Sequence, residues 1–408
     1  MDTTILHCDC NGFFASVECL LSPELKNVPM AVCGSPENRH GIILAKNELA
    51  KRFNVQTAET IWQAKRKCPD LVLVPPRHGE YEKYSGLVNE IYGRFTDKVE
   101  PFGIDESWLD VTGSRHLFGD GKQIADTLRE TVASEIGLTI SVGVSFNKVF
   151  AKLGSDYKKP NATTVIDRDN YTDIVFPLPV SDLLYVGKSA KETLSKLHIY
   201  TIGDLAKSDK NVIISKLGKM GEIIHEYANG LDDSPVKSMS DEREVKSVGN
   251  GMTFKRDLVG LSDIRLSINA LADSVASRLR QYGVKCSTVQ VTIRDPNFKT
   301  ITRQKALLHP THLSKEITCA ALEIIQSAWN LKAPIRMLTI TGANLYSSDD
   351  FEEQLSLFED DSCKKRKKQE HLEAAIDKIR DKYGRKALSF GSIIHNDLGI
   401  EEPNDEKS

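Results

Sequence analysis

Residues 98–112 read Lys-Val-Glu-Pro-Phe-Gly-Ile-Asp-Glu-Ser-Trp-Leu-Asp-Val-Thr, two short apolar segments on either side of a Gly-Ile-Asp-Glu turn. β-Branched and aromatic residues around such a turn predict a β-hairpin. We therefore expect Asp105 and Glu106 at its tip. The neighbouring segments predict a strand at 4–10, a helix at 81–95, a helix at 121–136, a strand at 139–145, a helix at 147–156 and a strand at 163–166. This order predicts an α+β fold with a split βαβ sheet.

The composition is that of a folded protein with several domains. The chain has 408 residues, of which 40% are hydrophobic and 27% charged, and this excludes collagen-like and wholly disordered chains. The N-terminus, MDTTILHCDC, has no basic stretch leading into a long apolar run, so we expect a cytoplasmic location and no membrane partner. The 8 cysteines are scattered without zinc-ligand spacing, which predicts reduced, buried side chains.

Charge is distributed unevenly along the chain. Residues 243–346 alternate strands with two helices and contain 15 lysines and arginines against 7 acids, a net charge of +8. Residues 347–408 contain 11 basic and 16 acidic residues, a net charge of −5. The overall net charge of −3 therefore conceals a basic domain suited to a polyanion. Between residues 167 and 235 the pattern predicts short helices and no strands.

Three carboxylates are expected at one edge of the first sheet. Asp9 ends a predicted buried strand, and Asp105 and Glu106 lie at the hairpin tip. Grouped carboxylate oxygens suit Mg²⁺, and two such ions would hold a triphosphate and activate a hydroxyl. The alternative for each acid alone is a solvated or capping side chain.

Three motifs extend this pattern: residues 7–18 (His-Cys-Asp-Cys-Asn-Gly-Phe-Phe-Ala-Ser-Val-Glu), 103–110 (Gly-Ile-Asp-Glu-Ser-Trp-Leu-Asp) and 141–152 (Ser-Val-Gly-Val-Ser-Phe-Asn-Lys-Val-Phe-Ala-Lys). Together they resemble the Y-family translesion DNA polymerases, and the nearest group is similar to bacterial DNA polymerase IV and its UmuC relatives. The resemblance covers residues 1–346. It implies a right-hand polymerase with a ferredoxin-like palm (1–10 and 78–166), small fingers (11–77), a helical thumb (167–235), an α/β little finger (243–346) and a flexible tail (347–408).

The resemblance also implies roles at the acidic edge. Asp9, Asp105 and Glu106 would be the catalytic, metal-binding carboxylates, and the backbone carbonyl of Cys10 would be a further ligand. The cofactor would be two Mg²⁺ ions, with Mn²⁺ as a substitute. The substrates would be primer-template DNA and deoxynucleoside triphosphates, and the enzyme would act as a monomer.

Phe14 follows Asp9 by five residues at the start of a predicted helix. By the resemblance it would be the steric gate, whose ring collides with a ribose 2′-hydroxyl. Periodicity alone allows a core phenylalanine equally well. The position three residues after the first aspartate is often aromatic in the family, whereas here it is Gly12, which leaves more room beside the nucleotide.

The triphosphate would be bound by Phe13, Lys51 and Lys159. The family commonly has a Tyr-Glu-Ala-Arg pattern in the fingers, but here Glu48 and Lys51 replace the tyrosine and the arginine. Lysine neutralises a phosphate without the planar fork of arginine, and Glu48 would repel a phosphate unless it points elsewhere. The alternative for Lys159 is a solvated loop lysine.

Two further regions are expected to bind DNA. Val186, Gly187 and Lys188 begin a segment that resembles a helix-hairpin-helix, which would offer backbone N–H groups to a phosphate. An ordinary pair of helices is the alternative, since only one turn glycine of the usual two is present. In the basic domain the expected phosphate contacts are Lys246, Lys255, Arg256, Arg294, Lys299 and Arg303; for any one of them, a solvated surface charge is the alternative.

Residues 354–358 read Gln-Leu-Ser-Leu-Phe within an acidic segment. They resemble the peptide that binds the bacterial sliding clamp (the beta subunit), in which Gln354, Leu357 and Phe358 would fill a pocket; an incidental tail is the alternative. A terminal amphipathic helix is expected at 371–383, without an assigned role.

Three functions compete for this sequence. The first is a low-fidelity translesion DNA polymerase, a nucleotidyltransferase that acts in DNA repair. The second is a catalytically weak, clamp-associated repair factor that keeps the fold for DNA binding. The intact acidic trio favours the polymerase. A nucleotidyl cyclase that shares only the palm sheet would need neither the basic domain nor the clamp peptide.

Overall fold

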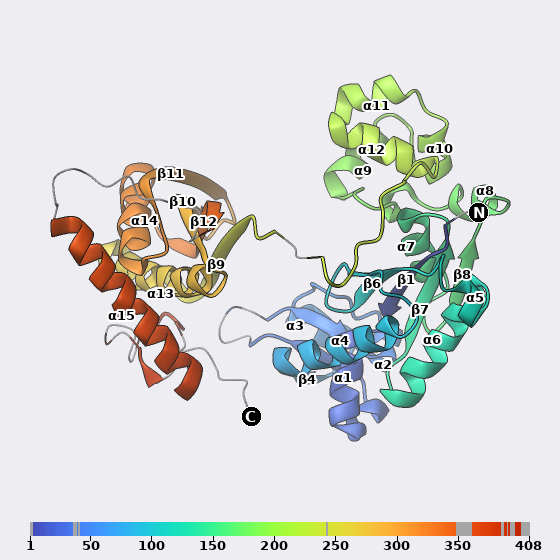
Figure 1. The fold of residues 1–408 in the computed structure, drawn as a ribbon, viewed down its shortest axis with the longest axis horizontal. Helices are drawn as coiled ribbons and strands as arrows, with labels where there is room; N and C mark the ends of the chain where they lie inside the picture. Colours follow the sequence, from blue (N-terminus) through green and yellow to red (C-terminus); the bar gives the residue numbers. More distant parts are fainter. Residues whose placement is uncertain are drawn as a thin grey trace. The chain divides into compact units, whose positions relative to one another are not determined.

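The computed structural model describes residues 3–35, 39, 41–241, 244–347, 361–384, 387–389, 391 and 396–400. The chain forms two compact units, one of residues 1–33 with 43–242 and one of residues 34–42 with 243–408 (Figure 1). In the described part of the chain, no helix is both long and apolar enough to cross a bilayer. The two units together contain helices and three separate sheets, so the α+β prediction is confirmed.

The first unit is built on a five-stranded sheet of order β5-β6-β1-β7-β8. The strands β7 and β8 are parallel, and the other neighbouring pairs are antiparallel. The central strand is β1, which pairs with β6 on one side and β7 on the other. The strand bounds are β1 (Ile5–Cys10), β5 (Val99–Pro101), β6 (Glu106–Asp110), β7 (Ile140–Ser145) and β8 (Thr163–Ile166).

The two faces of β1 have different surroundings. Leu6 and Cys8 belong to a core that includes residues of α4 (His78–Gly93) and α6 (Gly121–Glu135). Side chains alternate along a strand, so Ile5, His7 and Asp9 point to the other face. On that side Ile5 packs with Ala151 of α7 (Lys148–Tyr157). The alternation therefore directs Asp9 toward α7.

Helix α7 lies very close to the sheet because two glycines face each other. A Cβ built on Gly143 would lie 1.9 Å from the Ala151 carbonyl oxygen and 2.4 Å from the Ser155 nitrogen. A Cβ on Gly154 would lie 3.0 Å from the Cα of Gly143. Both obstacles are backbone atoms, so only glycine permits this approach.

The rest of the first unit consists of a small sheet and a set of short helices. The sheet has the order β3-β2-β4 and pairs β2 with β3 antiparallel and with β4 parallel. Its elements and the helices near it are α1 (Phe13–Leu21), β2 (Met30–Cys33), β3 (Ile43–Lys46), α2 (Glu48–Arg52), α3 (Ile61–Lys67) and β4 (Val72–Val74). The helices after the palm sheet are α8 (Tyr171–Val175), α9 (Lys188–Ser195), α10 (Ile202–Ala206), α11 (Lys210–Leu217) and α12 (Lys219–Ala228).

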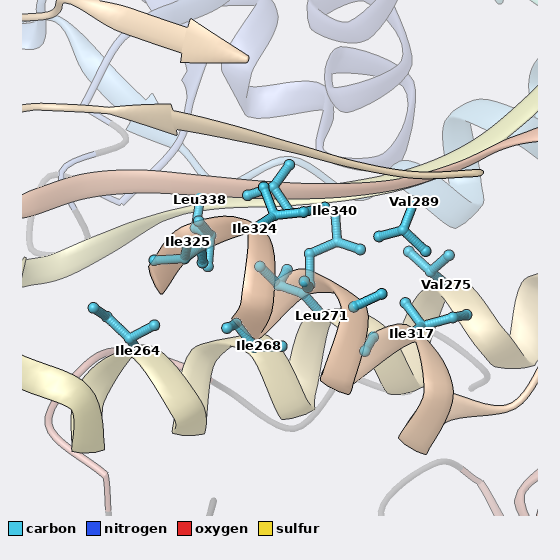
Figure 2. Close-up of a cluster of buried hydrophobic side chains, with 14 of the residues drawn as sticks. Ile264, Ile268, Leu271, Val275, Val289, Ile317, Ile324, Ile325, Leu338 and Ile340 are labelled. Carbon is cyan, nitrogen blue, oxygen red and sulfur yellow. The ribbon is translucent and has the colours of Figure 1, made fainter. Parts of the chain in front are cut away.

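The second unit has a four-stranded antiparallel sheet of order β11-β10-β12-β9. Its helices α13 and α14 cover one face, and Figure 2 shows their isoleucines meeting Val289, Leu338 and Ile340 of the sheet. The elements are β9 (Ser247–Leu258), α13 (Gly260–Gln281), β10 (Val284–Arg294), β11 (Thr300–Thr311), α14 (Ser314–Ala328) and β12 (Ile335–Ser347).

The opposite face of this sheet carries uncharged polar side chains along its middle and Arg294 at the end of β10. Thr292 lies opposite Thr302 in the register of β10 and β11, and their hydroxyl oxygens are 2.9 Å apart. Gln290 and Thr341 follow on the same face, opposite each other in β10 and β12. We refer to this surface as the open sheet face.

The tail was expected to be flexible, and its described parts are instead packed on the second unit. Helix α15 (Asp361–Tyr383) starts ten residues before the expected terminal helix. Leu398 and Ile400 are buried in the same core as α13 and α14, and the Lys255 N–H donates to the Leu398 carbonyl at 2.9 Å. The physical reason is that these two apolar side chains gain by leaving water.

Gly143→Ala should destabilise the first unit because the added methyl meets backbone that has no room to move. Overpacking of this kind costs roughly 1–3 kcal/mol, which lowers the thermal unfolding midpoint by several degrees. Gly86 is the matched control: it lies inside α4, and a Cβ there meets nothing within 4 Å. Gly86→Ala should leave the midpoint unchanged or raise it, and equal effects of the two variants would contradict the close-packing argument.

Candidate active site and nucleic-acid contacts

The three predicted carboxylates come together at one edge of the palm sheet. Asp9 lies opposite Glu106 in the antiparallel register of β1 and β6. The Cys10 N–H donates to the carbonyl of Asp105 at 2.9 Å, which ties the hairpin tip to the end of β1. Residues directly opposite in such a pair share a face, so Asp9 and Glu106 both point to the side of α7.

Lysines pair with two of the three acids. The Lys159 ammonium lies 2.8 Å from Asp9 Oδ2 and 2.7 Å from Asp156 Oδ1. Lys152, on α7, pairs with Glu106 Oε2. Of the two lysines, only Lys159 was predicted to lie in the site. Lys152 ends the motif at 141–152, for which the sequence predicted no separate role of this lysine.

The pKa values of the three acids are shifted differently because their charged neighbours differ. Burial, together with the charges of Asp9 and Glu106, raises the pKa of Asp105 to about 6. Burial alone would raise the pKa of Glu106, but hydrogen bonds from His7 and Lys152 lower it to about 2. Burial raises the pKa of Asp9, and Lys159 opposes that rise. The edge therefore carries more negative charge than the protein's own cations neutralise.

This donor set fits a divalent cation. Carboxylate oxygens are the ligands that Mg²⁺ and Mn²⁺ take, and the crowding that raises the pKa of Asp105 would be relieved by added positive charge. Within the described residues, no three carboxylate, imidazole or thiol side chains are already arranged to hold a metal ion. Lys159 must therefore leave Asp9 before both oxygens of that acid are free.

His7 is a contact of Glu106 that the sequence reasoning missed. Its side chain is fully buried, with Nδ1 2.8 Å from Ser155 Oγ and Nε2 3.3 Å from Glu106 Oε2. The ring also packs edge-on against Trp108, with centroids 5.3 Å apart. Strand alternation was the available signal, because His7 stands two residues before Asp9 and must share its face.

Phe14 is held by a stack of aromatic rings. Its ring lies parallel to that of Tyr81, at 4.1 Å between centroids and 14° between planes. The Tyr81 hydroxyl donates to Glu18 Oε1 at 2.6 Å, and Arg77 pairs with the same carboxylate. Sequence reasoning found none of these three supports, since Arg77 and Tyr81 are distant in the chain and the role of Glu18 depends on them. The half-buried Phe14 ring is thus fixed in position.

Phe13 and Gly12 have structural reasons for their identity. The Phe13 ring is buried in the palm core, so a contact of Phe13 with a triphosphate would come from its backbone. Gly12 has a φ of +55°, and a Cβ there would lie 3.3 Å from the Lys46 carbonyl oxygen. This left-handed conformation favours glycine, which explains the departure from the family's aromatic residue.

In the fingers, Glu48 and Lys51 contact each other. Their charged groups are 3.4 Å apart at i and i+3 of α2, and both side chains are more than half exposed. Asn47 caps this helix by accepting from the Ala50 N–H. Glu48 lies in the first turn, where the helix dipole favours an acid. A triphosphate near Lys51 would have to displace Glu48.

The segment of Val186, Gly187 and Lys188 begins helix α9 as expected. Gly187 precedes the first helical residue, and no side chain caps the free N–H groups there. A Cβ on Gly187 would meet nothing within 4 Å, so the backbone is open to an approaching group. Val186 is buried and anchors the turn.

The expected phosphate contacts of the second unit do not share one surface. Arg294 is on the open sheet face, next to Thr300. Arg303 lies opposite the buried Val291 and so points to the helical side of the sheet, at its edge. Arg256 pairs with Asp263 of α13 and with Asp397 of the tail, which leaves it poorly placed for a phosphate. The residues of the expected set that lie exposed are Lys246, Lys255, Lys299 and Arg303.

The predicted clamp residues Gln354, Leu357 and Phe358 lie outside the described residues. Described chain lies on both sides of them, since β12 ends at Ser347 and α15 begins at Asp361.

Replacing Asp105 by Asn should stabilise the metal-free protein above pH 6. The pKa of Asp105 is about 6 in the folded chain against 3.8 as its ordinary value, so the folded state holds its proton longer than the unfolded state. Ionisation of Asp105 therefore lowers the free energy of unfolding. This loss is complete above pH 6 and absent below pH 4. Unfolding midpoints of Asp105→Asn and wild type should converge at low pH. Asp97→Asn, at an exposed position away from the acidic edge, is the matched control.

Two family models match this chain. The impB/mucB/samB family model matches residues 8–156, and the model of that family's C-terminal domain matches residues 245–357. The DNA polymerase IV of Acetivibrio thermocellus is 47% identical over 400 residues, covering 98% of this chain and 99% of the relative. The DNA polymerase IV of Clostridium kluyveri is 38% identical, covering 97% and 99%.

A solved structure supports the same fold. A Y-family DNA polymerase chimera matches with a TM-score of 0.73, covering 84% of this chain and 98% of the chimera, at 22% identity. The expected right-hand polymerase fold is thereby confirmed. The chain belongs to the impB/mucB/samB family, and its assignment from three sequence motifs to the Y-family DNA polymerases of the polymerase IV type is confirmed.

Proposed function

We propose that this translesion DNA polymerase joins a deoxynucleoside triphosphate to a primer 3′-hydroxyl at Asp9, Asp105 and Glu106, with two Mg²⁺ ions as cofactors. The observation that supports this most is the convergence of three carboxylates on one sheet edge, with Asp105 carrying a raised pKa. Divalent ions, when bound there, neutralise phosphate charge and favour loss of the hydroxyl proton. The Cys10 carbonyl, next to Asp9 in the chain, is proposed as a further ligand.

The lysines and His7 prepare the site for its substrate. Lys152 and Lys159 neutralise the acids in the free protein, and both have phosphate as an alternative partner. We assign Lys159 to the triphosphate, because its ammonium already lies at the acidic edge, between Asp9 and Asp156. His7 is proposed to keep Glu106 in place, since it is buried and contacts that carboxylate directly.

The DNA substrate, the cellular location and the protein partner are also proposed. The N-terminus of α9 and the exposed basic residues of the second unit are proposed to bind the primer-template backbone without base specificity. We propose a monomeric enzyme in the cytoplasm that docks on a sliding clamp through residues 354–358. A catalytically weak repair factor is not favoured, because the full set of acids and their supporting contacts is present.

Asp105→Asn should abolish primer extension while leaving DNA binding close to normal. Loss of an anionic metal ligand removes several kcal/mol of transition-state stabilisation, which corresponds to at least about a hundredfold in rate. Asp110→Asn is the matched control, because Asp110 lies at the far end of β6, the strand that follows Asp105, and pairs with Lys98 at 3.0 Å. Extension and DNA anisotropy assays decide this: extension by Asp105→Asn within tenfold of wild type would refute the metal role.

Phe14→Ala should admit ribonucleotides, because the ring held against Tyr81 would no longer exclude a 2′-hydroxyl. The selectivity for deoxynucleotides, measured as the ratio of kcat/KM values, should fall by about tenfold or more. Phe14→Tyr keeps a ring in the same place and should keep the selectivity. Unchanged selectivity in Phe14→Ala would return this residue to a purely structural role.

Leu357→Ala with Phe358→Ala should remove clamp binding and leave extension without the clamp unchanged. Apolar anchors usually carry most of a docking peptide's affinity, and tethering raises the effective concentration of the enzyme at the primer end. Pull-down with the clamp and paired extension assays measure both effects. Normal clamp binding by the double variant would show that residues 354–358 are not the docking peptide.

A further inference from the structure

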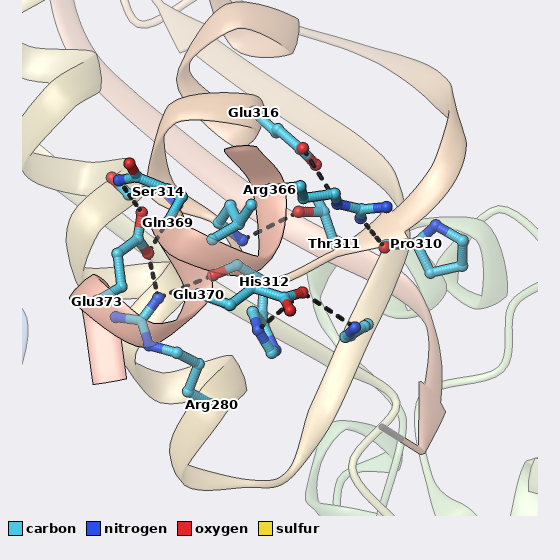
Figure 3. A network of polar contacts seen from close by, with 12 residues as sticks. Arg280, Pro310, Thr311, His312, Ser314, Glu316, Arg366, Gln369, Glu370 and Glu373 are labelled. Atoms are coloured by element: carbon cyan, nitrogen blue, oxygen red, sulfur yellow. Dashed lines mark hydrogen bonds and ion pairs between the residues drawn. The ribbon is translucent and has the colours of Figure 1, made fainter. Parts of the chain in front are cut away.

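Helix α15 is fixed on the second unit by ion pairs along one of its sides (Figure 3). The nearly buried Arg280 of α13 pairs with Glu373 and, at 2.5 Å, with Asp377. Glu373 also accepts from the Ser314 N–H at 3.1 Å. Further ion pairs join the same side of the helix to the unit: Glu370 with Lys285 at 3.2 Å, Arg366 with Glu316 at 3.3 Å, and Arg380 with Asp273 at 2.8 Å.

This docking places the acids of α15 inward and leaves its lysines outward. Breaking a buried ion pair by removing one partner costs several kcal/mol, so these contacts fix how the helix is rotated. The exposed side chains of α15 include Leu372, Ile379 and Tyr383 and five lysines, which we call the lysine face: Lys365, Lys367, Lys368, Lys378 and Lys382. Asp381 is the exposed acid among the described residues of the helix. None of the five lysines forms an ion pair with another described residue.

The lysine face is a rigid array of like charges. Lys365 and Lys382 are 17 residues apart, which at the helical rise corresponds to about 26 Å. Like charges held together on a surface are unfavourable without an anionic partner. A second copy of this chain would bring lysines against lysines, whereas a phosphate backbone presents a charge about every 3.4 Å along each strand. Charge complementarity therefore favours a nucleic acid as the partner.

We propose that the lysine face is a second DNA-binding surface of this polymerase, one that contacts the phosphate backbone. It is separate from the open sheet face, because α15 contacts α13 and α14, the helices that cover the opposite face of the sheet. Bound to phosphates there, the surface adds affinity for DNA that does not depend on sequence.

The test measures the salt dependence of DNA binding by the full chain. The variant carries Lys367→Gln, Lys368→Gln, Lys378→Gln and Lys382→Gln, and the matched control carries arginine at the same four positions. The probes are a blunt duplex of about 20 base pairs and a single strand of the same length, because each lost phosphate contact makes the slope of log K against log salt shallower by about 0.9 for a duplex and 0.7 for a single strand.

We expect the slope for the glutamine variant to become shallower by about 2 to 4 on at least one probe, and the arginine control to keep the wild-type slope. Extension of a short primer-template at low salt should stay unchanged, because none of the four lysines belongs to the catalytic site. An unchanged slope overturns the proposal. So does an equal loss in the arginine control, which would indicate a structural role. Loss of binding to the clamp, with DNA binding intact, would assign the surface to a protein partner and likewise overturn it.

Discussion

The structure depends on one constraint: three carboxylates must stay together on a single sheet edge although they repel one another. The pairing of β1 with β6 sets Asp9 opposite Glu106, and the bond from Cys10 to Asp105 adds the third acid. Helix α7 can supply Lys152 to this edge only because Gly143 lets it approach the sheet. A glycine in a buried strand thus determines how the acids are neutralised when no substrate is bound.

The same crowding links stability to activity. An acid whose pKa is raised to about 6 is ionised at neutral pH at some cost to the folded state. A cation bound beside Asp105 would recover that cost. Lys152 and Lys159 are internal substitutes for that cation. They are also movable, because a lysine side chain is flexible and holds its charge at a single point.

Local sequence patterns predicted the sheet and its acids well, because a hairpin turn and strand alternation are short-range properties. The partners of those acids were harder to find. His7 contacts Ser155 across 148 residues, and the stack of Phe14 on Tyr81 spans 67 positions of the sequence. The basic residues of the second unit show a related limit. Composition counts charges, but the register decides which face they occupy, so Arg303 lies on the helical side of the sheet and Arg294 on the open sheet face. Composition also does not show that Arg256 pairs with Asp263.

The tail shows that charge composition alone does not determine whether a segment is ordered. Its segments have low hydrophobicity and many charges, which predicts a flexible chain. Helix α15 is nevertheless fixed, because Arg280 and Lys285 on the folded unit meet acids spaced at three and four residues along the helix. That spacing puts Glu370, Glu373 and Asp377 on one side. The exposed lysines lie before and after these acids in the sequence, at 365–368 and at 378–382. The ion pairs that fix the rotation of the helix therefore also leave these lysines on its outer surface.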